Sequence, residues 1–143
     1  MKQQLKLSNQ LCFSFYALSR LVTSHYQPLL GPLDLTYPQY LVMLALWEHE
    51  ILSVKALGRL LMLDSGTLTP LLKRLEAKKL IKRMRSKEDE RIVNIQLTAA
   101  GKQLQQQATD IPEKMSCSMG FTAEEFNTLK PMIDIILQRH ATE

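Results

Sequence analysis

Apolar positions recur at helical spacing along most of this chain. From Leu7 to Leu30 they fall three or four residues apart, at Leu11, Phe15, Leu18, Leu21 and Val22, which is typical of an amphipathic helix. Ser8 is the expected N-cap, and Pro28 with Gly31-Pro32 marks the end. A second helix begins at Thr36 and Gln39, which form a capping-box pattern with Pro38 in the first turn. That helix is apolar nearly all round, so it is predicted to be central and buried.

A short helix, SVKALGRLLM, is predicted from Ser53, and the segment LDSGTLTPLLKRLEAKKLI follows it. There Leu68, Leu71, Leu72 and Leu75 form one apolar stripe. Residues 64–67 are turn and cap types. Because Pro70 fits best in a first turn, we predict that this helix starts at about Gly66 or Thr67 rather than Asp64.

After about residue 80 the apolar residues no longer recur every three or four positions but alternate with polar ones. Two β-rich runs, Ile81–Arg85 and Ile92–Leu97, flank a charged loop, and the second alternates apolar and polar residues as a half-buried strand does. Thr98 opens a polar helix that ends before Pro112. Thr122 and Glu125 form another capping box, and the final helix carries an apolar face of Phe126, Leu129, Met132, Ile133 and Ile136.

This order of elements predicts a mainly α fold with a small β-hairpin wing (α+β), that is, a winged helix-turn-helix. Small hydroxyl residues at the start of the fourth predicted helix can approach base edges in the major groove. The loop from Arg85 to Arg91 carries three basic residues and can reach phosphates or the minor groove. The alternative is that Lys73, Arg74 and Lys78 form an ordinary solvated face; the basic hairpin that follows favours DNA.

Composition sets the remaining bounds. The 143 residues suit one domain, with 45% hydrophobic and 22% charged residues and a net charge of +4, which permits a nucleic-acid partner. No membrane span and no signal-peptide pattern is found, so a cytoplasmic location is expected. Two cysteines do not make a disulfide scaffold. The three histidines, His25, His49 and His140, lack ligand spacing, so no metal and no cofactor is expected.

Three strings, LTYPQYLVMLALWE, LDSGTLTPLLKRLE and RSKEDERIVNIQLT, resemble the MarR family of bacterial regulators, and most of all its organic-hydroperoxide-sensing repressors. The resemblance implies a homodimer with interlocked N- and C-terminal helices that represses transcription from a pseudo-palindromic operator. Residues 1–143 would form a single domain, with 1–35 and 98–143 as dimerisation helices and 36–97 as the DNA-binding lobe. The resemblance also implies DNA contacts from Ser65, Gly66, Thr67, Thr69, Pro70, Lys73, Arg74, Asp89 and Arg91, with Arg91 in the minor groove.

The same resemblance identifies Cys12 as the sensor, with Tyr26 and Tyr37 of the partner subunit as its hydrogen-bond donors. Cys117 matches the resolving cysteine that some members carry before the last helix. Thiolate, not thiol, attacks a peroxide, and helix N-terminal dipoles and phenol donors favour the anion, whereas apolar burial opposes it. The sulfenic acid is then expected to form an intersubunit disulfide with Cys117, which would shift the two recognition helices.

Aromatic neighbours of Cys12 suggest which oxidant it meets. Phe13 and Tyr16 are expected to admit an alkyl hydroperoxide, whereas Phe15 and Trp47 are expected in the core. One alternative is a repressor released by a small aromatic ligand, with Cys12 structural. Another is a thiol peroxidase, against which the chain has no C-x-x-C and no thioredoxin-like βαβ pattern. We therefore predict a regulator and not an enzyme.

Overall fold

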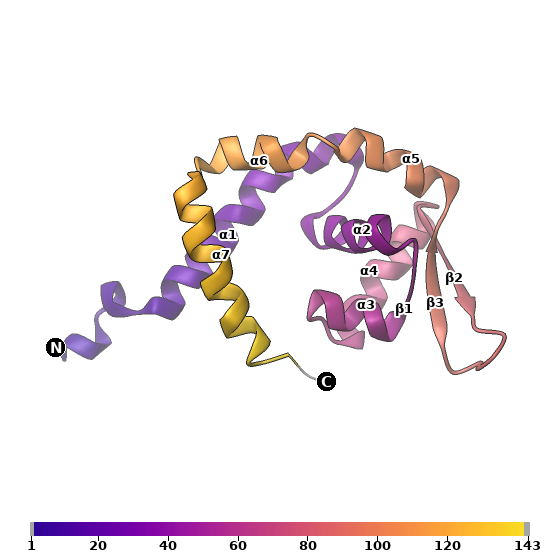
Figure 1. The fold of residues 1–143 in the computed structure, drawn as a ribbon, viewed down its shortest axis with the longest axis horizontal. Coiled ribbons are helices and arrows are strands. Elements are labelled where there is room, and N and C mark those ends of the chain that lie inside the picture. The colour runs from indigo at the N-terminus through magenta and orange to yellow at the C-terminus, as the bar shows by residue number, and fades with distance from the viewer. Residues whose placement is uncertain (1, 142–143) are drawn as a thin grey trace.

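The computed structural model describes residues 2–141 and shows seven α-helices and a small antiparallel sheet (Figure 1). In chain order, after two 3-10 turns at Gln3–Leu5 and Leu7–Asn9, the elements are α1 (Leu11–Leu30), a 3-10 turn (Gly31–Leu33), α2 (Tyr37–His49), β1 (Ile51–Ser53), α3 (Val54–Leu61), α4 (Ser65–Ala77), β2 (Ile81–Arg85), β3 (Val93–Leu97), α5 (Ala99–Ala108), α6 (Ile111–Met119) and α7 (Ala123–Gln138). The predicted fold class, mainly helical with a β-hairpin wing, is confirmed.

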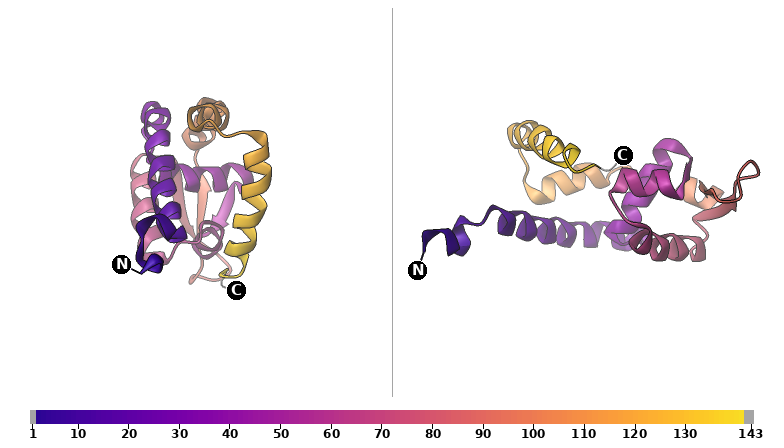
Figure 2. Two further views of the ribbon diagram at one scale, coloured as in Figure 1. Left: turned by 90° about the vertical axis from the view of Figure 1, so that its left-hand side faces the viewer. Right: turned by 90° about the horizontal axis from the view of Figure 1, so that it is seen from below.

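The elements form two regions, which α5 joins between β3 and α6. The winged-helix lobe, made of α2, β1, α3, α4, β2 and β3, gathers around one core, while the terminal-helix arm, made of α1, α6 and α7, extends away from it (Figure 1). Both views of Figure 2 show α1 and α7 standing apart from each other. The arm therefore leaves long helix faces without a neighbour in this chain.

The leucine stripe of α4 faces the core of the lobe. Leu68, Leu72 and Leu75 are each at most 1% exposed, and they meet the buried residues of α2, among them Tyr40, Val42, Met43 and Leu46. Burying a leucine side chain contributes about 1.5–3 kcal/mol. This packing fixes which face of α4 remains outside.

Side-chain caps begin most of the helices as the sequence predicted. Thr36 and Gln39 form the predicted capping box of α2, and Thr122 and Glu125 form that of α7. Ser53 accepts a hydrogen bond from the Ala56 N–H at 3.0 Å, and Thr98 caps α5 in the same way. These polar contacts satisfy backbone donors that a helix start leaves free.

Several local predictions were wrong. Ser8 lies in a 3-10 turn, and α1 begins after Gln10, which caps it without a side-chain hydrogen bond. Asp64 is the N-cap of α4, so Pro70 lies in the second turn. A proline there removes the bond to the Gly66 carbonyl, and Gly66 is exposed, so water can replace the lost donor.

Two elements were not predicted at all. The three-residue strand β1 pairs antiparallel with β3, giving the sheet order β1-β3-β2. Helix α6 begins at Ile111, so Pro112, which was predicted to be a boundary, lies in its first turn. Strand β3 also starts one residue later than expected, at Val93.

Among the helices of residues 2–141, none combines the length and apolar character needed to cross a bilayer.

Candidate functional site

The outer face of α4 carries the small and basic residues expected to meet DNA. Gly66, Thr67, Pro70, Lys73 and Arg74 are exposed, opposite the buried leucines, and Ser65 is exposed at the helix start. Thr69 is half-buried at the edge of this face. The helix therefore presents hydroxyls and cations outward along one side.

The turn between α3 and α4 holds this face in position. Met62 adopts a left-handed conformation (φ 54°), and the Leu63 N–H returns to the Gly58 carbonyl at 2.9 Å. A Cβ at Gly58 would approach the Leu63 carbonyl oxygen to 2.9 Å, too close for a backbone contact. The α3–α4 turn thus depends on glycine at position 58.

Asp64 fixes the first turn of α4. Its carboxylate accepts a hydrogen bond from the Thr67 N–H at 2.7 Å, and this bond holds the pKa of the Asp64 carboxyl below its usual value. The helix dipole favours an anion at this end.

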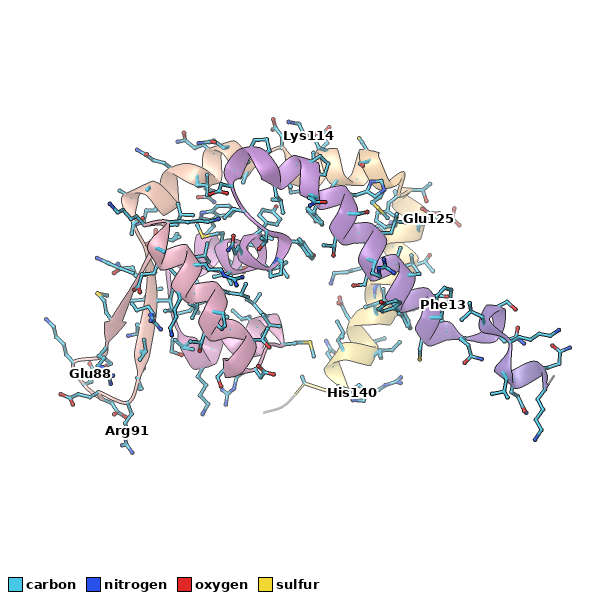
Figure 3. The ribbon with its side chains drawn as sticks, turned by 180° about the vertical axis from the view of Figure 1, so that it is seen from behind. Phe13, Glu88, Arg91, Lys114, Glu125 and His140 are labelled. Atoms are coloured by element: carbon cyan, nitrogen blue, oxygen red, sulfur yellow. The ribbon has the colours of Figure 1, made fainter. Side chains whose placement is uncertain are left out.

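The wing displays Arg91 on a short polar frame. The Asp89 carboxylate accepts hydrogen bonds from the Arg91 backbone N–H at 3.0 Å and from its Nε at 3.2 Å. The Arg91 side chain is nevertheless 92% exposed. Figure 3 shows it at the tip of the hairpin. Asp89 therefore orients the arginine without covering it, which suits a group that enters a groove.

A cavity of about 870 Å³ lies between α3, α4 and the wing. Thr69 of α4 and Arg91 of the wing both line it, together with three further cations: Lys55, Arg59 and Arg83. Asp64 is the acidic side chain in this lining. The two elements predicted to bind DNA therefore flank one hollow, and its charge is mainly positive.

Cys12 is the second residue of α1, and its thiol is exposed. The expected burial among aromatics is not found in one chain: Phe13 and Phe15 are each 43% exposed and Tyr16 is 61% exposed. Phe15 is thus outside the core, contrary to expectation.

Tyr26 and Tyr37 form a half-buried pair. Their rings stack with centroids 4.4 Å apart, and Tyr40 packs against Tyr26 at 5.8 Å. Burial, helped by the neighbouring Tyr37 and Tyr40, raises the pKa of Tyr26 to about 12, and burial also raises the pKa of Tyr37. Both phenols therefore keep their O–H proton at physiological pH and remain donors.

One chain does not bring the sensor residues together. Cys12 and Tyr26 both lie on α1, fourteen positions apart in a continuous helix, and at 1.5 Å per residue this separates them by about 21 Å. Cys117 lies on α6 beside Ser118, whose hydroxyl contacts His25 Nδ1 at 2.5 Å. Since His25 is about 20 Å along α1 from Cys12, Cys117 of the same chain also stands away from it.

Two polar contacts escaped the sequence reading. Lys78, which the sequence offered as part of a DNA-facing or a solvated helix face, instead turns inward to Asp34 and Gln39. Trp47, expected in the core, packs there edge-on to Tyr40 and also donates its Nε1–H to the Gly101 carbonyl at 2.9 Å. Each contact depends on how elements distant in the sequence pack together, so no local sequence pattern predicts it.

The fold and the exposed basic face define a winged helix-turn-helix protein. Residues 24–108 match the family described as "Transcriptional regulator SarA/Rot". The chain is 52% identical to the organic hydroperoxide resistance transcriptional regulator of Bacillus subtilis over 134 residues, which cover 94% of this chain and 91% of that one.

Solved structures agree with this assignment. The structure of reduced AbfR bound to DNA, a protein of Staphylococcus epidermidis, is 38% identical, covers 96% of both chains and gives a TM-score of 0.80. The structure of disulfide-formed AbfR, also 38% identical, covers 95% of this chain and 96% of that one at a TM-score of 0.63. The chain belongs to the MarR-type transcriptional regulators, in the group that includes the organic hydroperoxide resistance regulator. It is a regulator and not an enzyme, as predicted.

Proposed function

We propose that the chain is a homodimeric repressor that binds a pseudo-palindromic operator and releases it when an organic hydroperoxide oxidises Cys12. The observation that carries the redox part is the length of α1, which keeps Cys12 about 21 Å from Tyr26 of the same chain. A second subunit is needed to supply the tyrosine pair. The relative of this chain that is named for organic hydroperoxide resistance supports the choice of oxidant.

The exposed arm supports a dimer. None of the side chains of α7 is buried in the single chain, and Leu30 is the buried residue of α1. Exposed apolar residues of these two helices include Leu11, Phe13, Leu21, Phe126, Leu129, Met132 and Ile136. Contiguous apolar faces left exposed on a single chain are typical of interaction sites. Interlocked copies of 1–35 and 98–143 would cover them.

The DNA half of the proposal uses α4 and the wing of residues 36–97. In each subunit, Ser65, Thr67 and Lys73 would reach the major groove and Arg91 the minor groove. The chain resembles reduced, DNA-bound AbfR more closely than disulfide-formed AbfR, with TM-scores of 0.80 and 0.63. This supports the described conformation as the one that binds the operator.

Oxidation of Cys12 would proceed in two steps. The Cys12 thiolate attacks the outer peroxide oxygen, the O–O bond breaks, and after proton transfer the products are Cys12 sulfenic acid and an alcohol. The thiol of Cys117 in the other subunit then attacks that sulfur, forming the disulfide and releasing water. Because a disulfide needs its Cα atoms within about 7 Å, closing it would move α1 and α6 and separate the recognition helices from their half-sites.

The test compares Cys12→Ser with Cys117→Ser in operator binding, before and after one equivalent of an organic hydroperoxide. Reduced forms of both variants should bind as the wild type does. Cys12→Ser should stay bound after oxidation and form no crosslink, whereas Cys117→Ser should reach the sulfenic acid without the dimer-mass band on non-reducing electrophoresis. Release of the operator by hydroperoxide from Cys12→Ser would contradict the proposal and favour a ligand-released repressor.

A further inference from the structure

Lys78 closes the C-terminal end of α4 and is its C-cap residue. Its side chain is 29% exposed and its ammonium points at the segment that joins α1 to α2. There it donates to the Asp34 carbonyl, donates to Gln39 Oε1 at 3.2 Å, and lies 3.4 Å from an Asp34 carboxylate oxygen. One cation thus holds the end of the recognition helix to the start of α2.

Gln39 connects this cation to the sensor tyrosine. Its side chain is almost fully buried, with the residue 2% exposed. The same Oε1 atom accepts the Thr36 N–H at 3.1 Å, while Thr36 Oγ1 accepts the Gln39 N–H at 3.4 Å. Tyr37, stacked on Tyr26, is the first residue inside this capping box. The sensor phenol and the Lys78 contact therefore share one helical turn.

The leucine contacts between α4 and α2 do not duplicate this link. They are apolar and non-directional, so they tolerate small sliding movements. A charge-assisted hydrogen bond to a buried amide fixes both a distance and a direction. Within residues 2–141, Lys78 alone makes side-chain hydrogen bonds between 65–78 and the 31–39 segment.

We propose that Lys78 is a positioning residue that transmits a displacement of Tyr37 to the recognition helix, and this inference rests on the proposed redox function. When oxidation of Cys12 displaces the tyrosine pair, the Thr36–Gln39 box moves with Tyr37. Lys78 then carries the end of α4 with it. Without this link the oxidised dimer keeps its recognition helices on the operator.

The experiment measures operator affinity of the full-length protein by fluorescence anisotropy, reduced and after stoichiometric cumene hydroperoxide, with Cys12 oxidation followed by mass spectrometry. Four variants are compared with the wild type. Lys78→Met removes the donor of all the contacts to Asp34 and Gln39, whereas Gln39→Met removes only the acceptor on α2 and leaves the contacts to Asp34 in place; both keep a similar side-chain volume. Lys78→Arg keeps a cationic donor, and Lys79→Met removes the neighbouring charge, whose side chain makes no hydrogen bond or ion pair among the described residues.

Oxidation should weaken operator binding by the wild type, Lys78→Arg and Lys79→Met by about 5- to 150-fold, the usual range of coupling between sites. Lys78→Met and Gln39→Met should bind when reduced and oxidise at Cys12 equally fast, yet lose less than about threefold in affinity. Full release by both would overturn the inference. So would loss of operator binding by both in the reduced state, because the contact would then build the binding geometry itself. Failure of the wild type to release would instead refute the proposed function.

Discussion

The winged-helix lobe and the terminal-helix arm use similar apolar residues with opposite results. Leu72, in the lobe, is 1% exposed, whereas Leu11, in the arm, is 68% exposed. The lobe buries its side chains against elements close in sequence and closes within one chain. In the arm, α1 and α6 contact each other, but much of the apolar surface of α1 and most of that of α7 remains exposed in the same chain. The lobe thus completes its core within one chain, whereas the arm leaves the apolar faces that we propose form the dimer interface.

This difference also divides the two candidate sites. Residues 65–74 of α4 and Arg91, the candidates for DNA contact, stand on the closed lobe, so one chain already arranges them. Cys12 stands on the open arm, so its surroundings are incomplete in one chain. Operator binding should therefore be most sensitive to mutations that disturb folding of the lobe. The response of Cys12 to oxidants should be most sensitive to mutations that disturb dimer assembly.

The largest expected effect is on the lobe core. Leu72→Ala should lower the free energy of unfolding by about 2–5 kcal/mol, because it removes buried methyl groups and leaves a cavity. Leu60→Ala, at a residue 53% exposed, is the matched control and should change stability by less than about 0.5 kcal/mol. Urea denaturation followed by circular dichroism measures both free energies of unfolding. An equal loss of stability in the two variants would mean that the lobe core is wrongly assigned.

The next effect concerns assembly. Leu129→Glu places a charge in the middle of the apolar face of α7, and it should weaken dimerisation at least about 30-fold, as loss of an interface hot spot does. Asn127→Glu, on the opposite face of α7, should leave the dimer intact. Sedimentation equilibrium gives the dissociation constants, while circular dichroism should show a folded lobe in both variants. A stable Leu129→Glu dimer would refute the proposed interface.

A smaller effect is expected at the wing. Arg91→Ala should weaken operator binding by about 1–3 kcal/mol and reduce the dependence of log affinity on log salt by about one unit per lost contact. Lys130→Ala removes one positive charge from the arm and should do neither. Titrations of operator DNA at several salt concentrations distinguish the two variants. If Arg91→Ala changed neither the affinity nor its salt dependence, the wing would not belong to the DNA interface.

The smallest effect is a pH dependence at the start of α4. Since the folded pKa of Asp64 is lowered from 3.8, its stabilising contribution is present above that value and is lost as pH falls through the folded pKa. Asp64→Asn keeps a capping side chain but should flatten the fall of the melting temperature in acid. Asp110→Asn is the control, because Asp110 caps α6 without a side-chain hydrogen bond. Identical acid profiles for wild type and Asp64→Asn would contradict the role of this carboxylate.

Local patterns predicted individual helices better than short or proline-containing elements. The stripe of Leu68, Leu71, Leu72 and Leu75 and the capping boxes depend on neighbours three or four positions away, and both were confirmed. Strand β1 was missed because three residues are too short for an alternation to register. Helix α6 was missed because Pro112 was read as a break, although proline is favoured at the start of a helix.

The candidate sites were likewise predictable only where local periodicity determines the position of a side chain. The exposed side of α4 follows from where its leucines point, so the outward position of Thr67, Lys73 and Arg74 could be predicted from periodicity. Their contact with DNA was implied by the family resemblance and stays a prediction. The inward turn of Lys78 could not be predicted, because it depends on how α2 crosses α4. The exposure of Phe15 and Cys12 could not be predicted either, since the apolar face of α1 is the same whether its cover comes from this chain or from another.

Trp47 gives the molecule a built-in optical probe. It is the only tryptophan, its indole N–H holds the Gly101 carbonyl, and its ring touches Tyr40, which in turn touches Tyr26. Light absorbed at the red edge of the spectrum excites this one indole, so its emission reports on the junction between the tyrosine pair and α5. The unlabelled protein can therefore be followed in real time in a stopped-flow cell while an oxidant acts on it.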